Sequence, residues 1–500
     1  MSSKYVISSF AWSTSAKLFD ALVKFISVPL LLDFFGKSNF GLISLAISVN
    51  AYLQLLDMGV NTGAIKFFSE WISQKKFNLL DSAARTSISF YAIIGILNTV
   101  VLIWVSFYGM TIFSIDIQQA LALKNLFLIL AGFTVINWST SVFNQLIIAN
   151  HNIKFIQKIN ILRSFLNLLI IIITLKFDLN LELYFFLFCV ANCFMIFPYY
   201  LECKKSGLIF GFMPRGDWHN FNVIFKYSLA IIAMGIFQMS ATKLRPILLG
   251  IYSSNASDVL AEFRIMETIT IFIISIGGMF INILLPMTSK LLLDNDKNSI
   301  SKFAYKTTLF TSVACSILCF PFVVGGREIL LIYVGKEYAD LYPWLVIWVM
   351  TILFYLHNTP VATLILASGK TKMLVVSSAI ACVLSLLINV ILIPYYEVGS
   401  AIIGYGVYIV IQMSFYYFYF NNKVLDISSI RVFTSFIKPV SVGIFMTLIV
   451  FSIDFDFSDI YLALLVKEFA WLFGFLVFLF MFKILDDKVI KAEIGNIINK

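Results

Sequence analysis

Long apolar segments alternate with short polar stretches along the chain, and this alternation is the strongest pattern in the sequence. Dividing the chain at the polar stretches gives fourteen segments, each long enough as a helix to cross about 30 Å of hydrocarbon. The chain is therefore predicted to be an all-α polytopic membrane protein. The predicted membrane-spanning helices cover residues 10–32, 40–64, 84–110, 124–149, 160–177, 182–201, 224–251, 264–288, 306–324, 342–368, 374–394, 401–420, 437–454 and 460–482.

The basic residues predict how these helices are oriented. If the N-terminus is cytoplasmic, most of the 36 Lys and Arg residues fall in segments on the cytoplasmic side. Such an asymmetry predicts an even number of spans with both termini in the cytoplasm. It also accounts for most of the formal net charge of +9. Because the positive charges are spread over many short segments, nucleic acid is not an expected partner.

Composition agrees with this class and limits the chemistry. Hydrophobic residues make up 60% of the chain and charged residues 13%, against about 25% charged in soluble domains. The six cysteines lie within or at the ends of apolar segments without further ligands at metal spacing, so we expect small core residues and no metal site. No enzymatic motif or extramembrane catalytic domain is recognisable, so we expect neither an enzyme nor a bound cofactor. A membrane glycosyltransferase or polymerase is the enzymatic alternative.

Three charged residues share one face of the first predicted span. Lys17, Asp20 and Lys24 fall within about 60° of one another on a helix. A Lys or Asp in the middle of a membrane costs roughly 2.5 to 3.5 kcal/mol, so such side chains usually face a protein interior or a water-filled cavity. The stripe is either part of a functional cleft or an internally neutralised network that serves helix packing.

The second predicted span carries a matching polar stripe. Asn50, Gln54, Asp57 and Asn61 fall on one face of an otherwise apolar helix. This stripe is the natural partner of the charged stripe on the first span, with Asp57 and Lys17 at similar depth.

The seventh predicted span places Gln238 and Arg245 on one face and Lys243 nearly opposite. We favour Arg245 for the cleft, because Lys243 has room to snorkel or to pair with a neighbouring helix. In the eighth span, Arg264 and Glu267 are spaced to neutralise each other.

Charged and titratable residues of the later spans are expected to be structural. Lys467 and Glu468 lie in the last span, and His357 in the tenth is read as a satisfied core histidine in preference to a proton relay.

Two pairs of similar stretches predict an internal repeat. LIIANHNIKFIQ from Leu146 resembles LILASGKTKMLV from Leu364, and PLLLDFF from Pro29 resembles PILLGIY from Pro246 at nearly the same spacing. Each pair is displaced by six helices, and because six is even the two halves are parallel. We expect two six-helix lobes around a central cleft, in residues 1–205 and 206–423, followed by two additional helices in 424–500.

Several stretches resemble those of a known family of transporters. PLLLDFFGKSNFGLISLAISVNAYLQLLDMGVNTGAIKF, LGIYSSNASDVLAEFRIMETI, REILLIYVGKEY and LASGKTKMLVVSSAIACVLSLLINVILIPYYEVGSAIIGYGV occur in the order found in the Wzx-type oligosaccharide flippases. These belong to the multidrug/oligosaccharidyl-lipid/polysaccharide transporter superfamily. Many relatives carry an acidic residue just before the LLG-type stretch of the seventh span, where this chain reads KLRPILLG, so an ion-coupling role of that acid cannot be transferred.

The resemblance implies a MATE-like fold that alternates between inward-open and outward-open states. Its expected cargo is an undecaprenyl-diphosphate-linked oligosaccharide, such as an O-antigen repeat unit, moved from the cytoplasmic to the outer leaflet of the bacterial cytoplasmic (inner) membrane. Polysaccharide polymerase and chain-length machinery are the expected protein partners. A drug or small-molecule exporter and a peptidoglycan-precursor flippase on the same fold are the alternatives.

A cationic cleft would replace the hydration that the sugar and diphosphate lose in the membrane. The residues expected to contact the diphosphate or acidic sugars are Lys17, Lys24 and Arg245, and those expected to bind sugar hydroxyls are Asn50, Gln54, Asn61 and Gln238. Asp20 and Asp57 are expected to balance the charge of the empty cleft or to bind H⁺ or Na⁺ during the return step.

Overall fold

The regular elements of the described chain are helices. The computed structural model describes residues 3–278, 288, 296–368, 372–453, 457 and 459–484, and it describes only the backbone of residues 3–10, 56–59, 220, 227, 230–231 and 233–234. The helices are α1 (Ser3–Leu53), α2 (Leu55–Ser73), α3 (Phe77–Ile112), α4 (Ile117–Ala149), α5 (Ile153–Phe177), α6 (Leu181–Phe194), α7 (Ile196–Lys205), α8 (Trp218–Tyr252), α9 (Ala256–Gly277), α11 (Lys297–Val324), α12 (Gly326–Tyr333), the 3₁₀-helix η1 (Lys336–Leu341), α13 (Tyr342–Leu356), α14 (Thr359–Ala367), α15 (Lys372–Tyr396), α16 (Val398–Phe415), the π-helix η2 (Tyr416–Leu425), α17 (Ser429–Ser452) and α18 (Ile460–Met481).

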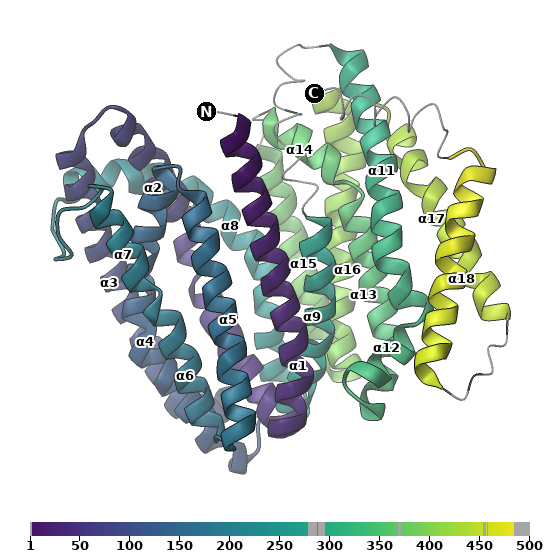
Figure 1. Ribbon diagram of the computed structural model, residues 1–500, viewed down its shortest axis with the longest axis horizontal. Coiled ribbons are helices and arrows are strands. Elements are labelled where there is room, and N and C mark those ends of the chain that lie inside the picture. Colours follow the sequence, from purple (N-terminus) through teal and green to yellow (C-terminus); the bar gives the residue numbers. More distant parts are fainter. Residues whose placement is uncertain are drawn as a thin grey trace. The chain divides into compact units, whose positions relative to one another are not determined.

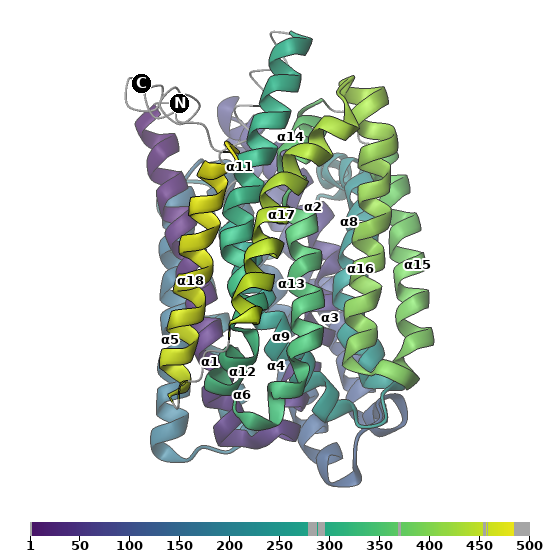
Figure 2. The same cartoon turned by 90° about the vertical axis from the view of Figure 1, so that its right-hand side faces the viewer.

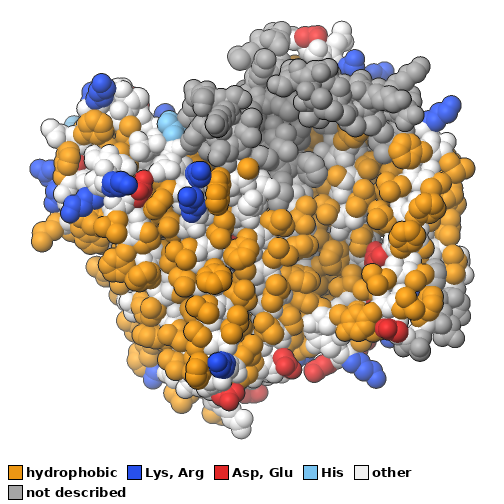
Figure 3. Space-filling view, viewed as in Figure 1, with side chains coloured by type: hydrophobic (Ala, Val, Ile, Leu, Met, Phe, Trp, Pro, Cys, Tyr) orange, Lys and Arg blue, Asp and Glu red, His pale blue; other side chains and the backbone are white. Residues whose placement is uncertain are grey.

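Ten helical segments of the described chain are long and apolar enough to cross a membrane. Three further predicted spans fall on α1 with α2 and on α8. The eighth predicted span, 264–288, begins on α9, and its residues 279–287 lie outside the described part of the chain. The prediction of an all-α, multi-pass membrane protein is confirmed. On the face seen in Figure 3, apolar side chains cover the flanks of the helices, while Lys and Arg gather near the helix ends.

The helices form two compact units. The first unit comprises residues 1–272 and 378–408, and the second comprises residues 273–377 and 409–500. In the first unit, α3 packs along α4, α2 along α8 and α1 along α5 (Figure 1). In the second unit, α11 packs against α13 and α17, and α17 against α18 (Figure 2). These units follow packing, not internal similarity, so the predicted repeat and its boundaries stay a prediction.

One helix break separates the first two predicted spans, and three others fall within predicted spans: 40–64 is broken at Gln54, 182–201 at Met195 and 342–368 after Leu356. The helix α1 is interrupted at Gly36, whose φ of 77° and ψ of 165° separate the first span from the second. The predicted tenth span is wrong as a continuous helix, because α13 ends at Leu356 and α14 begins at Thr359. Pro360 explains this break, because in an unbroken helix its ring would clash with the carbonyl oxygen of Leu356, four residues earlier.

Close backbone approach holds α1 against α9 in the first unit. A Cβ atom at Gly41 would lie 1.8 Å from the carbonyl oxygen of Ser257, so only glycine fits at this position. Lys37 Nζ lies 2.8 Å from Glu262 Oε1 beside this contact, and Ser38 Oγ donates to Asp258 at 2.9 Å. The second half of α1, which carries Asn50 of the polar stripe, is therefore fixed from the side of α9.

The last two helices are attached to the second unit by an aromatic cluster. Trp471 of α18 stacks on Phe320 of α11 with ring centroids 5.2 Å apart, and its Nε1 donates to the carbonyl of Gly443 at 3.2 Å. A side chain at Gly443 would collide with Phe320 at 2.6 Å. Because the rings of Trp471 and Phe320 are fully buried, α17 and α18 are an integral part of the second unit.

Candidate functional site

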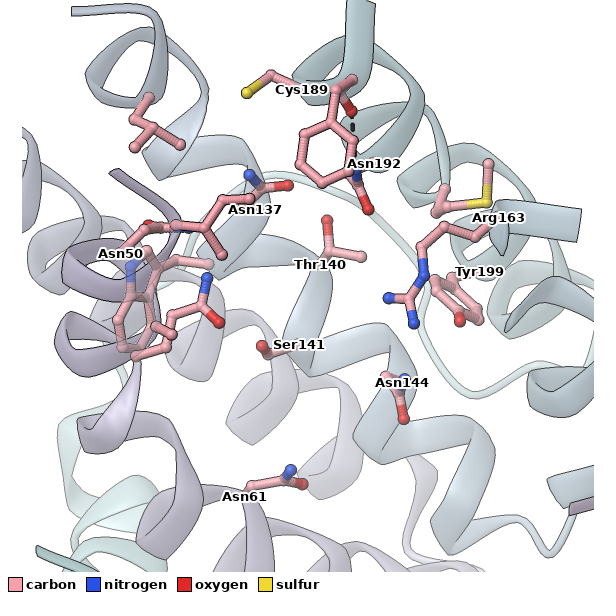
Figure 4. Close-up of a pocket in the computed structure, with 17 residues that line it drawn as sticks. Asn50, Asn61, Asn137, Thr140, Ser141, Asn144, Arg163, Cys189, Asn192 and Tyr199 are labelled. Carbon is pink, nitrogen blue, oxygen red and sulfur yellow. Dashed lines mark hydrogen bonds between the residues drawn. The ribbon is translucent and has the colours of Figure 1, made fainter. Parts of the chain in front are cut away.

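A cavity of about 420 Å³ lies in the first unit and is lined by side chains that form hydrogen bonds; we call it the amide cavity. Figure 4 shows side chains of Asn137, Asn192 and Arg163 pointing into the space. The aromatic ring of Trp138 also lines the cavity. The polar lining residues come from six helices and the turn at Gln54: Asn50 on α1, Asn61 on α2, Asn137, Thr140, Ser141 and Asn144 on α4, Arg163 on α5, Asn192 on α6 and Tyr199 on α7.

Part of the hydrogen-bonding capacity of the amide cavity is unused. Asn192 Nδ2 donates to the carbonyl of Phe188 at 2.7 Å, which leaves its amide oxygen free to accept. The buried Oδ1 of Asn61 has no hydrogen-bond partner in the described chain. Asn50 and Asn144 also make no side-chain hydrogen bond to the described residues. Because an amide offers two donors and an acceptor, these side chains are available for a polar ligand.

A second cavity of about 390 Å³ adjoins the first; we call it the charged cavity. Its lining includes Asp20, Lys24, Lys243 and Arg264. The two cavities adjoin because they share four lining residues, namely Ile47, Arg163, Phe188 and Asn192. Arg163 is the shared residue that carries a charge.

Two sets of ion pairs organise the charged cavity. On α1, Lys24 Nζ lies 2.7 Å from Asp20 Oδ2, and Asp20 Oδ1 accepts a hydrogen bond of 2.7 Å from Ser164. The Lys24 side chain remains 53% exposed, so its pairing does not remove it from the cavity. Asp20 and Lys24 thus form an ion pair, as the packing alternative expected, and both line a cavity, as the prediction of a cleft expected.

The second set centres on Glu267 of α9. Arg264 Nη1 lies 2.6 Å from Glu267 Oε2, which confirms the predicted pair, and Lys243 Nζ of α8 lies 4.0 Å from Glu267 Oε1. Of the two cations of the seventh span, Lys243 and not Arg245 lines this cavity, the reverse of the preference stated from the sequence. The cavity lining therefore carries more cations than these two carboxylates can neutralise: Lys24, Arg163, Lys243 and Arg264 against Asp20 and Glu267.

The structure brings together some of the predicted site residues and separates others. Asn50, Gln54 and Asn61 line the amide cavity, and Asp20 and Lys24 line the charged cavity. Neither cavity includes the exposed side chains of Lys17 and Gln238. The side chain of Asp57 lies outside the described part of the chain, so its expected meeting with Lys17 is not described.

Arg245 lies apart from both cavities. Its side chain is 3% exposed, and its guanidinium sits 5.0 Å from the centre of the Tyr405 ring of α16. Its Nε and Nη2 have no hydrogen-bond partner in the described chain. A buried cation with unsatisfied donors is costly, and the aromatic face offsets only part of that cost. The role of Arg245 in substrate binding stays a prediction.

Other titratable residues have structural surroundings. His357 is fully buried, with Nδ1 at 2.5 Å from the carbonyl of Phe354 and Nε2 at 2.7 Å from the Tyr417 hydroxyl, which confirms the core histidine. Lys467, which was predicted to be structural, has its Nζ 2.7 Å from Glu328 Oε1. The six cysteines are buried and free, also as predicted.

Two contributions to the site were absent from the sequence-based prediction. The residues Asn137, Thr140, Ser141 and Asn144 form a helical stripe, and their spacing was the available signal. The fifth span was predicted to begin at residue 160, which put Arg163 near its cytoplasmic end, so Arg163 was not singled out as a site residue. The helix α5 begins at Ile153, which places Arg163 well inside the helix and beside the cavities.

Comparisons with known proteins agree with the fold. No family model matches the chain. The structure of the lipid II flippase MurJ in an inward closed conformation matches with a TM-score of 0.74 at 14% identity, covering 94% of this chain and 98% of that one. An inward-facing multidrug resistance MATE family transporter of the MOP superfamily matches with a TM-score of 0.66 at 13% identity, covering 79% of this chain and 92% of that one.

These matches show the fold of the protein. It is a multi-pass membrane protein with the MATE-like fold of the flippase and transporter structures that it matches, the fold that the resemblance seen in the sequence implied. A curated relative, the capsular polysaccharide biosynthesis protein CapF of Staphylococcus aureus, is 31% identical over 156 residues. That match covers 30% of this chain and 39% of the relative's length.

Proposed function

We propose that this protein is a flippase that moves an undecaprenyl-diphosphate-linked oligosaccharide, such as an O-antigen or similar repeat unit, from the cytoplasmic to the outer leaflet by alternating access. The observation that carries the proposal is the junction of the amide cavity and the charged cavity in the first unit. Such a substrate consists of a neutral or acidic sugar head next to a diphosphate, and the two cavities offer one environment for each part.

The amide cavity has the chemistry that sugar hydroxyls require. Hydroxyl groups both donate and accept hydrogen bonds, and the side chains of Asn50, Asn61 and Asn144 offer both functions. Each sugar hydroxyl that leaves water without a replacement hydrogen bond costs roughly 1 to 3 kcal/mol. The aromatic ring of Trp138 adds an apolar surface to the same cavity. A cavity lined in this way compensates the desolvation of an oligosaccharide head.

The charged cavity has the chemistry that a diphosphate requires. Lys24 and Lys243 supply ammonium groups, and Arg163 and Arg264 supply guanidinium groups suited to bidentate contacts with phosphate oxygens. A surplus of cations also disfavours the cationic drugs carried by many exporters, since like charges repel. In this proposal the diphosphate lies near Lys24, and Arg163 spans the boundary with the sugar head.

The relatives support the proposal at different levels. CapF is named for capsular polysaccharide biosynthesis, and MurJ is named as a lipid II flippase. The fold similarity to MurJ and to a MATE transporter supports transport by a transporter of this class. A bacterial inner-membrane location, cytoplasmic termini and coupling to H⁺ or Na⁺ through Asp20 and Asp57 belong to the proposal, as do polysaccharide polymerase and chain-length proteins as partners.

Surface display of long-chain polysaccharide in a deletion strain tests this function. The strain is complemented with the wild-type gene, with Lys24→Gln, with the double variant Asn50→Ala/Asn144→Ala, or with Asn160→Ala as a matched control. Asn160 lies on α5, is half-buried and lines neither cavity.

We expect deletion to abolish display, and the control to restore it as the wild type does. Lys24→Gln and the double variant should fail at normal membrane abundance. Unchanged display after deletion, in a strain without a redundant flippase, would contradict the proposal. Arrest of cell-wall synthesis upon deletion would instead favour a peptidoglycan-precursor flippase.

A further inference from the structure

The second unit contains a cavity of about 540 Å³ where α11, α17 and α18 meet; we call it the basic cavity. Three cations line it, Arg431 and Lys438 on α17 and Lys483 just after the end of α18. None of its lining residues is a carboxylate. Within the described chain, none of the three cations has a recorded ion pair or hydrogen bond from its side chain.

The geometry of α17 directs its two cations into the same space. Arg431 and Lys438 are seven residues apart, which places them on one face of the helix within about 20°. Thr434 and Ser435 lie between them and also line the cavity, so hydroxyl donors are interleaved with the cations. The side chain of Ser428 caps the start of α17 at this position, accepting from the Arg431 amide at 3.4 Å.

The cavity is held in shape by contacts between its helices. The Tyr305 hydroxyl of α11, which lines the cavity, accepts a hydrogen bond of 2.9 Å from the backbone amide of Ser428. On the side of α18, the Lys483 amide donates to the carbonyl of Phe480 at 3.0 Å and closes the helix end. The backbone positions of the three cations are therefore fixed relative to one another, unlike those of Lys residues scattered over a solvated surface.

The position of the basic cavity along the helices matches a membrane interface. Arg431 and Lys483 lie just outside the predicted spans 437–454 and 460–482, and Tyr305 lies next to the predicted span 306–324. Exposed apolar side chains adjoin the cations, with Ile430 at 78% and Phe482 at 57% exposure. The charged head of a lipid and the start of its acyl chains therefore find complementary surfaces side by side.

We propose that the basic cavity binds the headgroup of an anionic bilayer phospholipid. Basic pockets between membrane helices on the cytoplasmic side bind such headgroups, and each Lys or Arg near the surface strengthens attraction to anionic lipid about fivefold. The predicted topology places all three cations on the cytoplasmic side. The site lies within the second unit and is independent of the proposed function, which rests on cavities of the first unit.

Lipid titration of the purified full-length protein in detergent tests the proposal. Phosphatidylglycerol or phosphatidylcholine is added, and bound lipid is counted by native mass spectrometry while the thermal unfolding midpoint is recorded. The variants are the three single substitutions Arg431→Gln, Lys438→Gln and Lys483→Gln, and the triple variant. Lys423→Gln is the matched control, because Lys423 is an exposed cation in the last turn of η2 that does not line the cavity.

We expect the wild type to bind phosphatidylglycerol in preference to phosphatidylcholine. Each single variant should weaken phosphatidylglycerol binding about fivefold and the triple variant roughly a hundredfold, with the control within twofold of wild type. The three single substitutions replace exposed side chains, so these variants should fold. They therefore measure the contribution of each cation to phosphatidylglycerol binding even if the triple variant does not fold.

Three results would overturn the proposal. Equal binding of both lipids by the wild type would exclude an anionic headgroup site. Equal losses in Lys423→Gln and the cavity variants would indicate diffuse attraction to the surface. Displacement of phosphatidylglycerol by undecaprenyl diphosphate at much lower concentration would assign the cavity to the isoprenoid diphosphate instead of a bilayer phospholipid.

Discussion

Replacing Glu267 with Gln should have two opposite effects. It should lower the stability of the protein and strengthen the binding of anions in the charged cavity. Glu267 pairs with Arg264 at 2.6 Å and lies 4.0 Å from Lys243, so the substitution leaves two cations without their carboxylate. Removing one partner of a buried ion pair costs about 3 to 5 kcal/mol. Because the Arg264 side chain is 22% exposed and borders a cavity, we expect a loss near 3 kcal/mol.

The same substitution should strengthen binding of a diphosphate. A carboxylate about 8 Å from a phosphate charge, at an effective dielectric constant of about 20, repels it by roughly 2 kcal/mol. Glu267→Gln removes this repulsion, which corresponds to about thirtyfold tighter binding. The variant is therefore predicted to be less stable without ligand but to gain more stability from undecaprenyl diphosphate than the wild type does.

Thermal unfolding of purified protein with and without undecaprenyl diphosphate measures both effects. Glu262→Gln is the matched control, since Glu262 lies on the same helix and pairs with Lys37 at 2.8 Å but lines neither cavity. Both variants should unfold at lower temperature, and only Glu267→Gln should show a larger ligand-induced shift. A wild-type or smaller shift in Glu267→Gln would show that Glu267 does not repel the bound diphosphate.

Three further substitutions test the packing. Gly41→Ala places a Cβ atom 1.8 Å from the carbonyl oxygen of Ser257 and should cost on the order of 3 kcal/mol or more, seen as loss of monodisperse protein on size exclusion; normal yield would contradict this contact. Arg245→Met removes buried guanidinium donors that have no partner in the described chain. It should therefore leave the free energy of unfolding unchanged or raise it by up to about 4 kcal/mol, seen as an equal or higher unfolding midpoint. A clear fall in the midpoint would show that these donors have partners. Trp471→Phe should lower the free energy of unfolding by about 1 kcal/mol, because the indole N–H no longer donates to the Gly443 carbonyl and the Thr447 hydroxyl. An unchanged unfolding midpoint would assign all of the contribution of Trp471 to ring packing.

Helical periodicity predicted one part of the site well. Asn50, Gln54 and Asn61 were grouped by spacing alone, and they line one cavity because a helix presents every third or fourth residue to the same side. The stripe from Asn137 to Asn144 obeys the same rule. Ser, Thr and Asn are tolerated in membrane helices through hydrogen bonds to their own backbone, so such a stripe stands out less than charged residues do.

Periodicity identifies a helix face but not the neighbour that covers it at each depth. Gln238 and Arg245 share a face of α8, yet Gln238 is exposed while Arg245 is buried beneath Tyr405 of α16. That contact joins residues far apart in the chain and has no local signal. Arg163 was missed for another reason, since charged and polar residues at the start of α5 concealed where the helix begins.

Reconstitution into liposomes measures directly whether the protein moves a lipid-linked oligosaccharide across a bilayer. Purified protein is incorporated with a fluorescent undecaprenyl-diphosphate-linked oligosaccharide, and a membrane-impermeant glycosidase reports how much of the lipid reaches the outer leaflet over time. We expect wild-type protein to expose lipid that was initially protected in the inner leaflet. Asn160→Ala should match it, while Lys24→Gln and Asn50→Ala/Asn144→Ala should be slow. Exposure no faster than in protein-free liposomes, with correctly folded wild-type protein under an imposed H⁺ or Na⁺ gradient, would contradict the proposed function.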